Sequence, residues 1–535
     1  MKASLLLFLF LIAIGHSHAF AQVPVAADTL RSVEILRADK LSIKKVDENT
    51  EVQILAGNVR LRQGTTLFSC DSCVINNKTK EFEAFGKVHI NDDTTNVYAN
   101  YLKYLANTEM AHLRGKVRLT DGHGTLTTEV LDYDVARKIG TYNNGGRVVT
   151  KKSVLTSKEG VYYTDIKDIY FRKNVELKDP AYYLKSDSLL YNTETQTATF
   201  IAETFLRDSA GRTINTTAGT YDMRTGSAQF IERTAIEDKG VRIVGDQIAS
   251  DDQTGMVQIL GNGVLIDTAQ GISILANEIF ADRNKEAYLA TRKPLMIIKQ
   301  ETDSIYVTAD TLFTARLSDR FPARVDSTAK DSAAIKTVKG AKPVKDSTDR
   351  YFEAFKNVRI FSDSLQSVSD SLFYSFKDSV FRLFQNPIVW ANNSQISGDT
   401  IFLYTENKKA KRVQVFENSL LVNEMDPGVY NQIQSTRMDG FFINGVIDSV
   451  RARGMAETVY FLRDDKDSTY TGINQTNSDV MDVYFAKGDL YKVVFRSSVK
   501  GTFWPASEEK RASLRLSRFS WQEARRPKTK YDLFE

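Results

Sequence analysis

A short sequence box recurs along this chain at a nearly fixed spacing, and this repeat decides which folds are open to it. The boxes Gly-Asn-Val-Arg-Leu, Gly-Lys-Val-His-Ile and Gly-Lys-Val-Arg-Leu begin at Gly57, Gly86 and Gly115, so consecutive boxes are 29 residues apart. The register continues at Val175 and restarts at Lys356. Such a period is typical of stacked supersecondary units, because one unit of this size cannot bury its own apolar face.

A second box lies in the middle of the unit and keeps the same register. It begins at Asn100, Asp187, Asp370 and Asp399, and its first two copies are 87 residues apart, which is three periods. The chain therefore has room for about fifteen units, each expected to hold two or three short strands and their turns.

The pattern inside the glycine-valine box has a period of two, which predicts strands with one apolar and one solvated face. No long amphipathic helical pattern precedes the C-terminal tail, so the fold is expected to be all-β with little helix. The apolar stripe is interpreted either as a packed core or as a trough that shelters acyl chains. Its members are Val59, Leu61, Val88, Ile90, Val117, Leu119, Val175, Leu177, Val358 and Ile360.

The N-terminal segment, residues 1–21, is typical of a cleaved export signal. Lys2 precedes an unbroken apolar run, and Ala19-Phe20-Ala21 forms a small-x-small cleavage site. The apolar run is too short to span a bilayer, which argues against a membrane anchor. The mature protein is therefore expected to be soluble and extracytoplasmic.

Composition divides the rest of the chain into four segments. Residues 22–316 and 351–505 are predicted to be two blocks of the repeat, separated by a flexible linker or insertion at 317–350 that has few large apolar side chains. The tail, residues 506–535, carries a net charge of +3 with interleaved Leu, Phe and Trp. It is interpreted as a solvated end, a docking arm or an interfacial membrane segment.

Charge and histidine content exclude several classes of function. The chain has 71 Lys and Arg against 67 Asp and Glu, so its formal charge of +4 does not predict nucleic acid as a partner. Beyond the export signal, the imidazoles are those of His89, His112 and His123, so neither a zinc nor a haem enzyme is expected, and no cofactor is predicted. Without signal and tail the body is formally neutral, which favours acyl-chain burial over phosphate binding.

The spacing Cys70-Asp71-Ser72-Cys73 matches that of a redox pair but lies in a strand-like run. Redox cysteines of this spacing normally sit at a helix N-terminus, which lowers the thiol pKa. In a regular strand the two side chains would point to opposite faces. Free structural thiols, a structural disulfide if the strand bends, and redox chemistry all remain open.

Adjacent acidic residues occur at Asp92-Asp93, Asp251-Asp252 and Asp464-Asp465. Two carboxylates can flank a glycosidic bond in a polysaccharide enzyme, but these pairs lie at predicted turns, where Asp satisfies backbone groups. The sequence shows no known catalytic motif, and a non-enzymatic protein is predicted.

The repeat resembles the OstA-like (organic solvent tolerance) family, which includes the periplasmic lipopolysaccharide transport protein LptA and the N-terminal domain of LptD. The resemblance is clearest over residues 34–205 and reappears over 351–420. It rests on the boxes at Gly57 and Gly86 and on Asn76-Asn77-Lys78 and Phe82-Glu83-Ala84-Phe85 between them. It implies an antiparallel β-jelly-roll that stacks end to end into a bridge, inside which lipopolysaccharide acyl chains travel between the two membranes.

The expected function is that of a periplasmic, envelope-associated transport scaffold that contributes to outer-membrane assembly. Its expected partners are lipopolysaccharide or a related glycolipid and, by end-to-end strand addition, other Lpt-type β-jelly-roll proteins such as LptC-like and LptD-like ones. A secreted β-solenoid polysaccharide hydrolase or lyase and a structural or adhesive repeat protein are the alternatives.

Overall fold

The computed structural model describes residues 32–321 and 348–534, except 49, 300–303, 407–408, 444–445, 465–468 and 487–488. The predicted export signal and most of the predicted linker lie outside the described residues. Contacts within the chain divide it into a first unit that ends at Thr141 and a second unit that begins at Tyr142. Both units are built from antiparallel strands, so the predicted repetitive all-β jelly-roll is confirmed.

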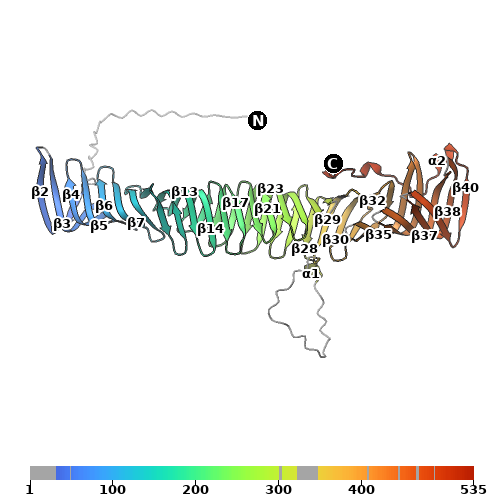
Figure 1. Ribbon diagram of the computed structural model, residues 1–535, viewed down its shortest axis with the longest axis horizontal. Coiled ribbons are helices and arrows are strands. Elements are labelled where there is room, and N and C mark those ends of the chain that lie inside the picture. The colour runs from blue at the N-terminus through green and yellow to red at the C-terminus, as the bar shows by residue number, and fades with distance from the viewer. Residues whose placement is uncertain are drawn as a thin grey trace, which may run out of the picture. The chain divides into compact units, whose positions relative to one another are not determined.

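The first unit is a meander in which consecutive long strands pair with one another. Figure 1 shows these strands side by side in chain order. They are β1 (Glu34–Arg37), β2 (Lys40–Asp47), β3 (Thr50–Gln63), β4 (Thr66–Asn76), β5 (Glu81–Asp92), β6 (Thr95–Leu105), β7 (Met110–Thr120), β8 (Thr125–Asp134) and the beginning of β9 (Ile139–Tyr142).

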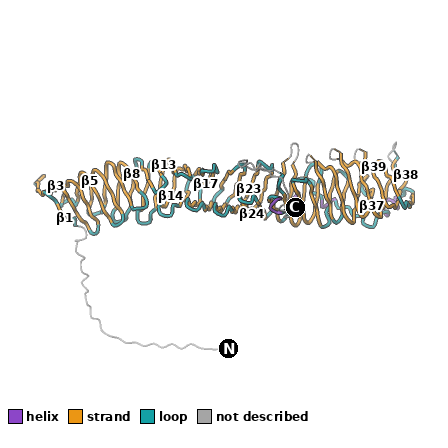
Figure 2. Tube along the Cα trace, turned by 90° about the horizontal axis from the view of Figure 1, so that it is seen from below, coloured by secondary structure: helices purple, strands orange, loops and turns teal. Residues whose placement is uncertain are grey.

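The second unit continues the antiparallel pattern with shorter strands at first and with long ones near its end (Figure 2). Its first strands are β10 (Gly146–Val149), β11 (Val154–Ser157), β12 (Glu159–Tyr163), β13 (Asp168–Lys178), β14 (Tyr182–Asn192), β15 (Thr197–Phe200), β16 (Thr204–Asp208), β17 (Thr213–Thr216), β18 (Gly219–Asp222), β19 (Ser227–Phe230), β20 (Thr234–Asp238), β21 (Val241–Gly245), β22 (Gln247–Asp251), β23 (Met256–Asp267), β24 (Ile272–Asp282), β25 (Ala287–Thr291), β26 (Leu295–Lys299), β27 (Ser304–Thr308) and β28 (Thr311–Ala315).

Strand pairing continues on the far side of residues 322–347, because β28 pairs with β29. The remaining strands are β29 (Tyr351–Phe361), β30 (Gln366–Ser375), β31 (Val380–Phe384), β32 (Ile388–Ala391), β33 (Ser394–Ser397), β34 (Thr400–Glu406), β35 (Lys409–Asp426), β36 (Val429–Ile443), β37 (Val446–Arg463), β38 (Tyr470–Ala486), β39 (Asp489–Arg496) and β40 (Lys500–Trp504).

Helix is scarce in the described chain, as predicted. The helices are α1 (Leu317–Arg320), α2 (Glu508–Ser513) and the 3-10 turns η2 (Glu523–Arg525) and η3 (Asp532–Phe534). None of the described helices combines the length and the apolar character that a membrane crossing requires.

Each glycine-valine box forms a corner inside one long strand, so a unit of the first part holds two bent strands in place of several short ones. Gly57 and Asn58 both adopt left-handed backbone conformations, with φ of +77° and +46°, and the strand register shifts there. Glycine tolerates this conformation, and asparagine tolerates it better than most residues. The bulge bends the strand, so its two halves lie on opposite walls of the jelly-roll.

The second sequence box lies against these corners, which explains why both boxes share one period. A Cβ atom added to Gly115 would lie 3.1 Å from the side-chain amide of Asn100, the first residue of the second box. In the preceding units Asp71 and Asp39 take the place of Asn100, and a Cβ atom added to Gly86 or Gly57 would lie 2.5 Å from their carboxylates. The Asn58 side chain also donates a hydrogen bond to Asp39 at 2.8 Å. The glycine and the acidic residue therefore form one corner.

The C-terminal segment, residues 514–534, lies on the chain's own sheet, and we call it the C-terminal strap. Figure 1 shows it running from α2, beside β38, back toward β29. Gln432 accepts a hydrogen bond from the Leu516 N–H (2.8 Å) and donates one to the Leu514 carbonyl (3.2 Å). Gln395 binds the main chain on both sides of Trp521 in the same way, at 2.8 Å each. None of the three interpretations of the basic tail, as a solvated end, an arm that docks on a partner or an interfacial membrane segment, places it on the chain's own sheet, where it lies.

The strap explains why the strands beneath it are buried on both faces. All four residues of β32 are buried, including Trp390, which the sheet register places between Gln366 and Gln395. Gln366 accepts hydrogen bonds from Arg526 of the strap, and Gln395 binds the strap main chain. One face of these strands therefore packs in the interior and the other packs under the strap.

Candidate lipid-binding interior

The ten apolar residues of the predicted stripe all lie in the interior of the two units. Their side chains are 0 to 4% exposed. The first unit buries the members from Val59 to Leu119, and the second buries those from Val175 to Ile360. The alternation of the boxes thus places the expected residues on the inner face, while neighbours such as Arg118 face solvent.

In the first unit the interior is filled by side chains from both walls. Phe68 comes from the half-strand after the β3–β4 turn, and Phe82 and Tyr104 come from the opposite wall. The Phe68 ring centroid lies 5.3 Å from that of Phe82 and 4.7 Å from that of Tyr104. The structure therefore shows a packed apolar core, so an acyl chain would have to separate the two walls to enter.

The two walls meet at a line opposite the corners, where two rows of strand-connecting turns face each other; we call this line the seam. In the first unit the Gln63 amide donates to the Ala106 carbonyl across the seam at 3.0 Å. The Tyr133 hydroxyl donates to Asp92 at 3.3 Å, and Lys138 lies 3.8 Å from Asp93. Because side chains make these contacts, the walls can separate there without breaking strand pairing.

A buried cluster of charges holds the seam of the second unit. The Arg212 guanidinium, whose side chain is 6% exposed, donates two hydrogen bonds to Asp252 at 2.5 and 2.6 Å. Arg283 and the Tyr221 hydroxyl donate to the same carboxylate at 2.6 and 3.0 Å. Asp208 lies 3.0 Å from the Arg212 Nε. A single carboxylate from one row of turns thus binds an arginine of the other row.

The protonation of this cluster follows from its contacts. Burial by itself would raise the pKa of Asp252, but the hydrogen bonds and charges of Arg212 and Arg283 outweigh burial and lower it to about 2. Burial acts to lower the pKa of Arg212, and the hydrogen bonds and charge of Asp252 raise it above its usual range. The Asp252 carboxylate and the Arg212 guanidinium therefore both stay ionised throughout the physiological pH range.

Next to this cluster the seam opens into a cavity of about 160 Å³. Its apolar floor includes Ile236, Ile243 and Val257, and its polar wall includes Arg212 and Arg283. The floor residues belong to the inner face of the jelly-roll and are only 3 to 5% exposed, so the cavity reaches the edge of the apolar interior at this point of the seam.

Sequence reasoning missed the seam cluster. The interpretation of Asp251-Asp252 as turn residues fits Asp251, which accepts hydrogen bonds from the main chain of Gln253 and Thr254 at 2.8 and 3.1 Å. Asp252 instead binds Arg212, 40 residues earlier in the chain. The available signal in the sequence was Arg212, a single arginine in an otherwise ordinary turn, and its position does not indicate that Asp252 is its partner.

Cys70 and Cys73 are both buried, and both thiols are free in this structure. They flank Asp71, the residue that lies against the Gly86 corner, and the β4–β5 register shifts between Ser69 and Ser72. The bulge at this point shifts the alternation of inward and outward side chains by one residue, so both thiols point inward although they are three residues apart. A disulfide between them stays a prediction.

Both cysteines are expected to resist alkylation in the folded protein and to react fully once it is unfolded. The hydrogen bond between the two thiols, together with burial, raises the pKa of Cys73, and the same hydrogen bond lowers the pKa of Cys70. The expected resistance of Cys70 therefore rests on its burial, which keeps the reagent away from its sulfur. Timed labelling with iodoacetamide, followed by mass spectrometry, measures both thiols. Rapid labelling of the folded, reduced protein would contradict the buried arrangement.

The N-terminal edge of the first unit exposes strands whose apolar side chains have no neighbour beyond them among the residues that the structure describes. β1 and β2 both pair with β3, and every residue of β2 is exposed, with Leu41 at 57% and Ile43 at 64%. Leu41 lies opposite the buried Leu55 in the register, so it extends the inner apolar face to the edge.

Comparison with known proteins supports the resemblance over the N-terminal repeats. Residues 31–187 match the family described as OstA-like protein. Among solved structures, one match is LptH of Pseudomonas aeruginosa, the LptA-homologous periplasmic component of its lipopolysaccharide transport device. The identity is 13%, the match covers 32% of this chain and 80% of that one, and the TM-score is 0.14. Comparison with curated proteins found no match.

Proposed function

We propose that this chain, with its OstA-like segment at residues 31–187, is a non-enzymatic periplasmic protein that shelters the acyl chains of lipopolysaccharide or a related glycolipid. In this role it contributes to lipid transport and outer-membrane assembly. The sugar part of the lipid stays outside, and the acyl chains lie between the two walls.

One observation carries this proposal: the apolar inner face recurs from Val59 to Ile360, and side chains close it along the seam. Moving an acyl chain from water into such an interior is favourable by about 0.8 kcal/mol for each buried CH₂ group. Separating the walls breaks side-chain contacts and leaves the strand ladders intact. The formal neutrality of the repeat body also favours recognition of the acyl chains over recognition of phosphates.

The exposed edge strands suggest how partners attach. Within the described part of the chain, β1 and β2 pair on one side only, with β3, and their other side offers backbone groups beside apolar side chains, which is the arrangement that strand addition requires. We propose other Lpt-type β-jelly-roll proteins, LptC-like or LptD-like, as the partners. A partner strand there would extend both the sheet and the apolar inner face.

A photo-crosslinking amino acid at Val88 or Val117 is expected to capture glycolipid in cells, because both side chains face the interior. The matched control is Arg118, which neighbours Val117 in the same strand and faces solvent. Adducts are identified by mass spectrometry after mild extraction. If Val88 and Val117 crosslink to protein neighbours alone, the interior is a core and the lipid-shelter function is wrong.

A further inference from the structure

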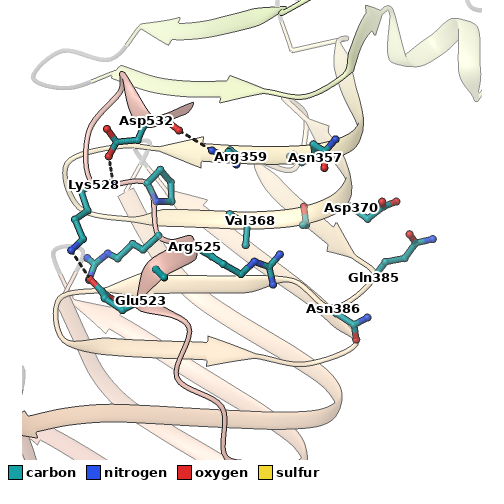
Figure 3. A pocket seen from close by; sticks show the side chains of 15 residues that line it. Asn357, Arg359, Val368, Asp370, Gln385, Asn386, Glu523, Arg525, Lys528 and Asp532 are labelled. Carbon is teal, nitrogen blue, oxygen red and sulfur yellow. Dashed lines mark hydrogen bonds and ion pairs between the residues drawn. The ribbon is translucent and has the colours of Figure 1, made fainter. Parts of the chain in front are cut away.

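The C-terminal strap forms one side of a surface groove that is separate from the interior. The groove has a volume of about 990 Å³ and lies between the strap and the corners of β29–β32 (Figure 3). Figure 3 shows Asn357, Gln385 and Asn386 on the corner side and Val368 in the floor. Val368 lies on the sheet face that the strap covers, opposite Arg359 in the register.

The strap is held firmly where it borders this groove. Arg526 donates hydrogen bonds to the Gln366 side chain at 2.7 and 2.9 Å and to the Asn392 carbonyl at 2.9 Å. Arg359 of the sheet donates to the Asp532 carbonyl at 2.8 Å. Both walls of the groove are therefore ordered before any ligand arrives, which reduces the entropy cost of binding.

The charges around the groove leave the guanidinium groups of Arg359 and Arg525, and on the corner side the carboxylate of Asp370, without an ion pair in the described chain (Figure 3). The groove is lined by four cationic and three acidic side chains. Glu523 lies 3.7 Å from both Arg526 and Lys528, and Asp532 accepts hydrogen bonds from the main chain at Lys528. Within the described chain, Arg525 makes no ion pair, and its guanidinium donates to Gln522 at 2.8 Å.

The corner side of the groove supplies side-chain amides, each of which can both donate and accept a hydrogen bond. Gln385 and Asn386 adopt φ of +64° and +57°, and their exposed side chains have no hydrogen-bond partner in the described chain. An amide offers both a donor and an acceptor, which is what a sugar hydroxyl requires. A guanidinium opposite them suits a phosphate or carboxylate group.

We propose that this groove binds a saccharide that carries an oxyanion, either a phosphate or a carboxylate. Arg525 pairs with the anion, and the amides of Gln385 and Asn386 bind the sugar hydroxyls. This site lies on the outer face and does not depend on lipid in the interior. Because the strap forms one wall, the ligand also stabilises the docked strap by mass action.

The test uses the full chain and four probes: glucose 1-phosphate, glucuronate, glucose and inorganic phosphate. Calorimetry is expected to detect the two anionic sugars and to give much weaker binding for glucose and for inorganic phosphate. The bound sugar should also slow amide hydrogen exchange in residues 514–534. If inorganic phosphate binds as tightly as glucose 1-phosphate, the sugar part of the proposal is wrong.

Two variants, each of which removes one positive charge from the strap, distinguish specific binding of the anionic sugar by Arg525 from its general attraction to a basic segment. Arg525→Gln is expected to weaken glucose 1-phosphate binding by roughly tenfold or more, because a charge-assisted hydrogen bond is lost. Lys530→Gln removes a strap cation that does not line the groove and should bind normally. Hydrogen exchange verifies that the strap is still docked in both. Equal losses in the two variants, or no binding of any probe to the unaltered chain, would overturn the proposal.

Discussion

Asp252→Ala is expected to destabilise the strands around the seam cluster by up to about 3–5 kcal/mol, the usual cost of removing one partner of a buried ion pair, because Arg212 then keeps only Asp208 as an anionic partner. The variant removes the acceptor of the two hydrogen bonds that Arg212 donates to Asp252 and of those from Arg283 and Tyr221. Hydrogen exchange of β17 to β24 measures the loss locally, which matters because a long repeat array need not unfold in one step.

The control for this variant is Glu237→Ala. Glu237 and Arg242 form an exposed pair at 3.8 Å, and such pairs contribute at most about 1 kcal/mol.

The pH dependence of stability provides a second measurement of the Asp252 contribution. The folded pKa of Asp252 is about 2, below the value of about 3.9 for a free Asp, so its stabilising effect is complete above about pH 5 and is lost as the pH falls through about 2. Asp252→Ala should lack this part of the acid dependence; equal stability losses in both alanine variants would contradict the buried pair.

Leu516→Ala is expected to release the N-terminal part of the strap, at a cost of about 2–5 kcal/mol. Leu516 is buried against Val459, Phe461 and Ile473 on the sheet. Once the strap leaves, these residues face water, so faster exchange in residues 514–526 and stronger binding of an apolar dye are expected.

The matched control is Phe534→Ala on the same strap, because Phe534 is 46% exposed and its truncation should change stability by about 0.5 kcal/mol or less. If Leu516→Ala and Phe534→Ala behave alike, the strap does not depend on the apolar contact at Leu516. Removal of residues 514–535 provides the upper limit of the effect, since it uncovers Trp390 as well.

The sequence predicted which residues face the interior better than it predicted the contacts that close the seam and hold the strap. Val59 and Leu61 could be assigned to an inner face because alternation is local. The glycines of the boxes could be found by their spacing, but that they bend a long strand into a corner was not predicted. That Asp39 lies against Gly57 could not be read from the pattern, although the shared period of the two boxes contained the signal.

Contacts across the seam and under the strap were inaccessible for a different reason. Arg212 and Asp252 are 40 residues apart, and Gln395 and Trp521 are 126 residues apart, so their meeting depends on the stacking of intervening strands. Gln395 also binds main-chain groups, which every sequence offers alike. Nothing in the composition of the tail therefore indicated which strands would receive it.

The hydrogen-bonding of the turns gives the second unit a directional stiffness. Within a single row, consecutive turns are joined by backbone hydrogen bonds, such as Ser209 N–H to the Ala181 carbonyl at 2.8 Å and Thr268 N–H to the Gly240 carbonyl at 3.1 Å. Across the seam the rows are held by side chains such as Arg212 and Asp252. The second unit is therefore expected to be mechanically anisotropic. A force along the rows would have to break backbone hydrogen bonds, whereas a force across the seam would have to break only side-chain contacts.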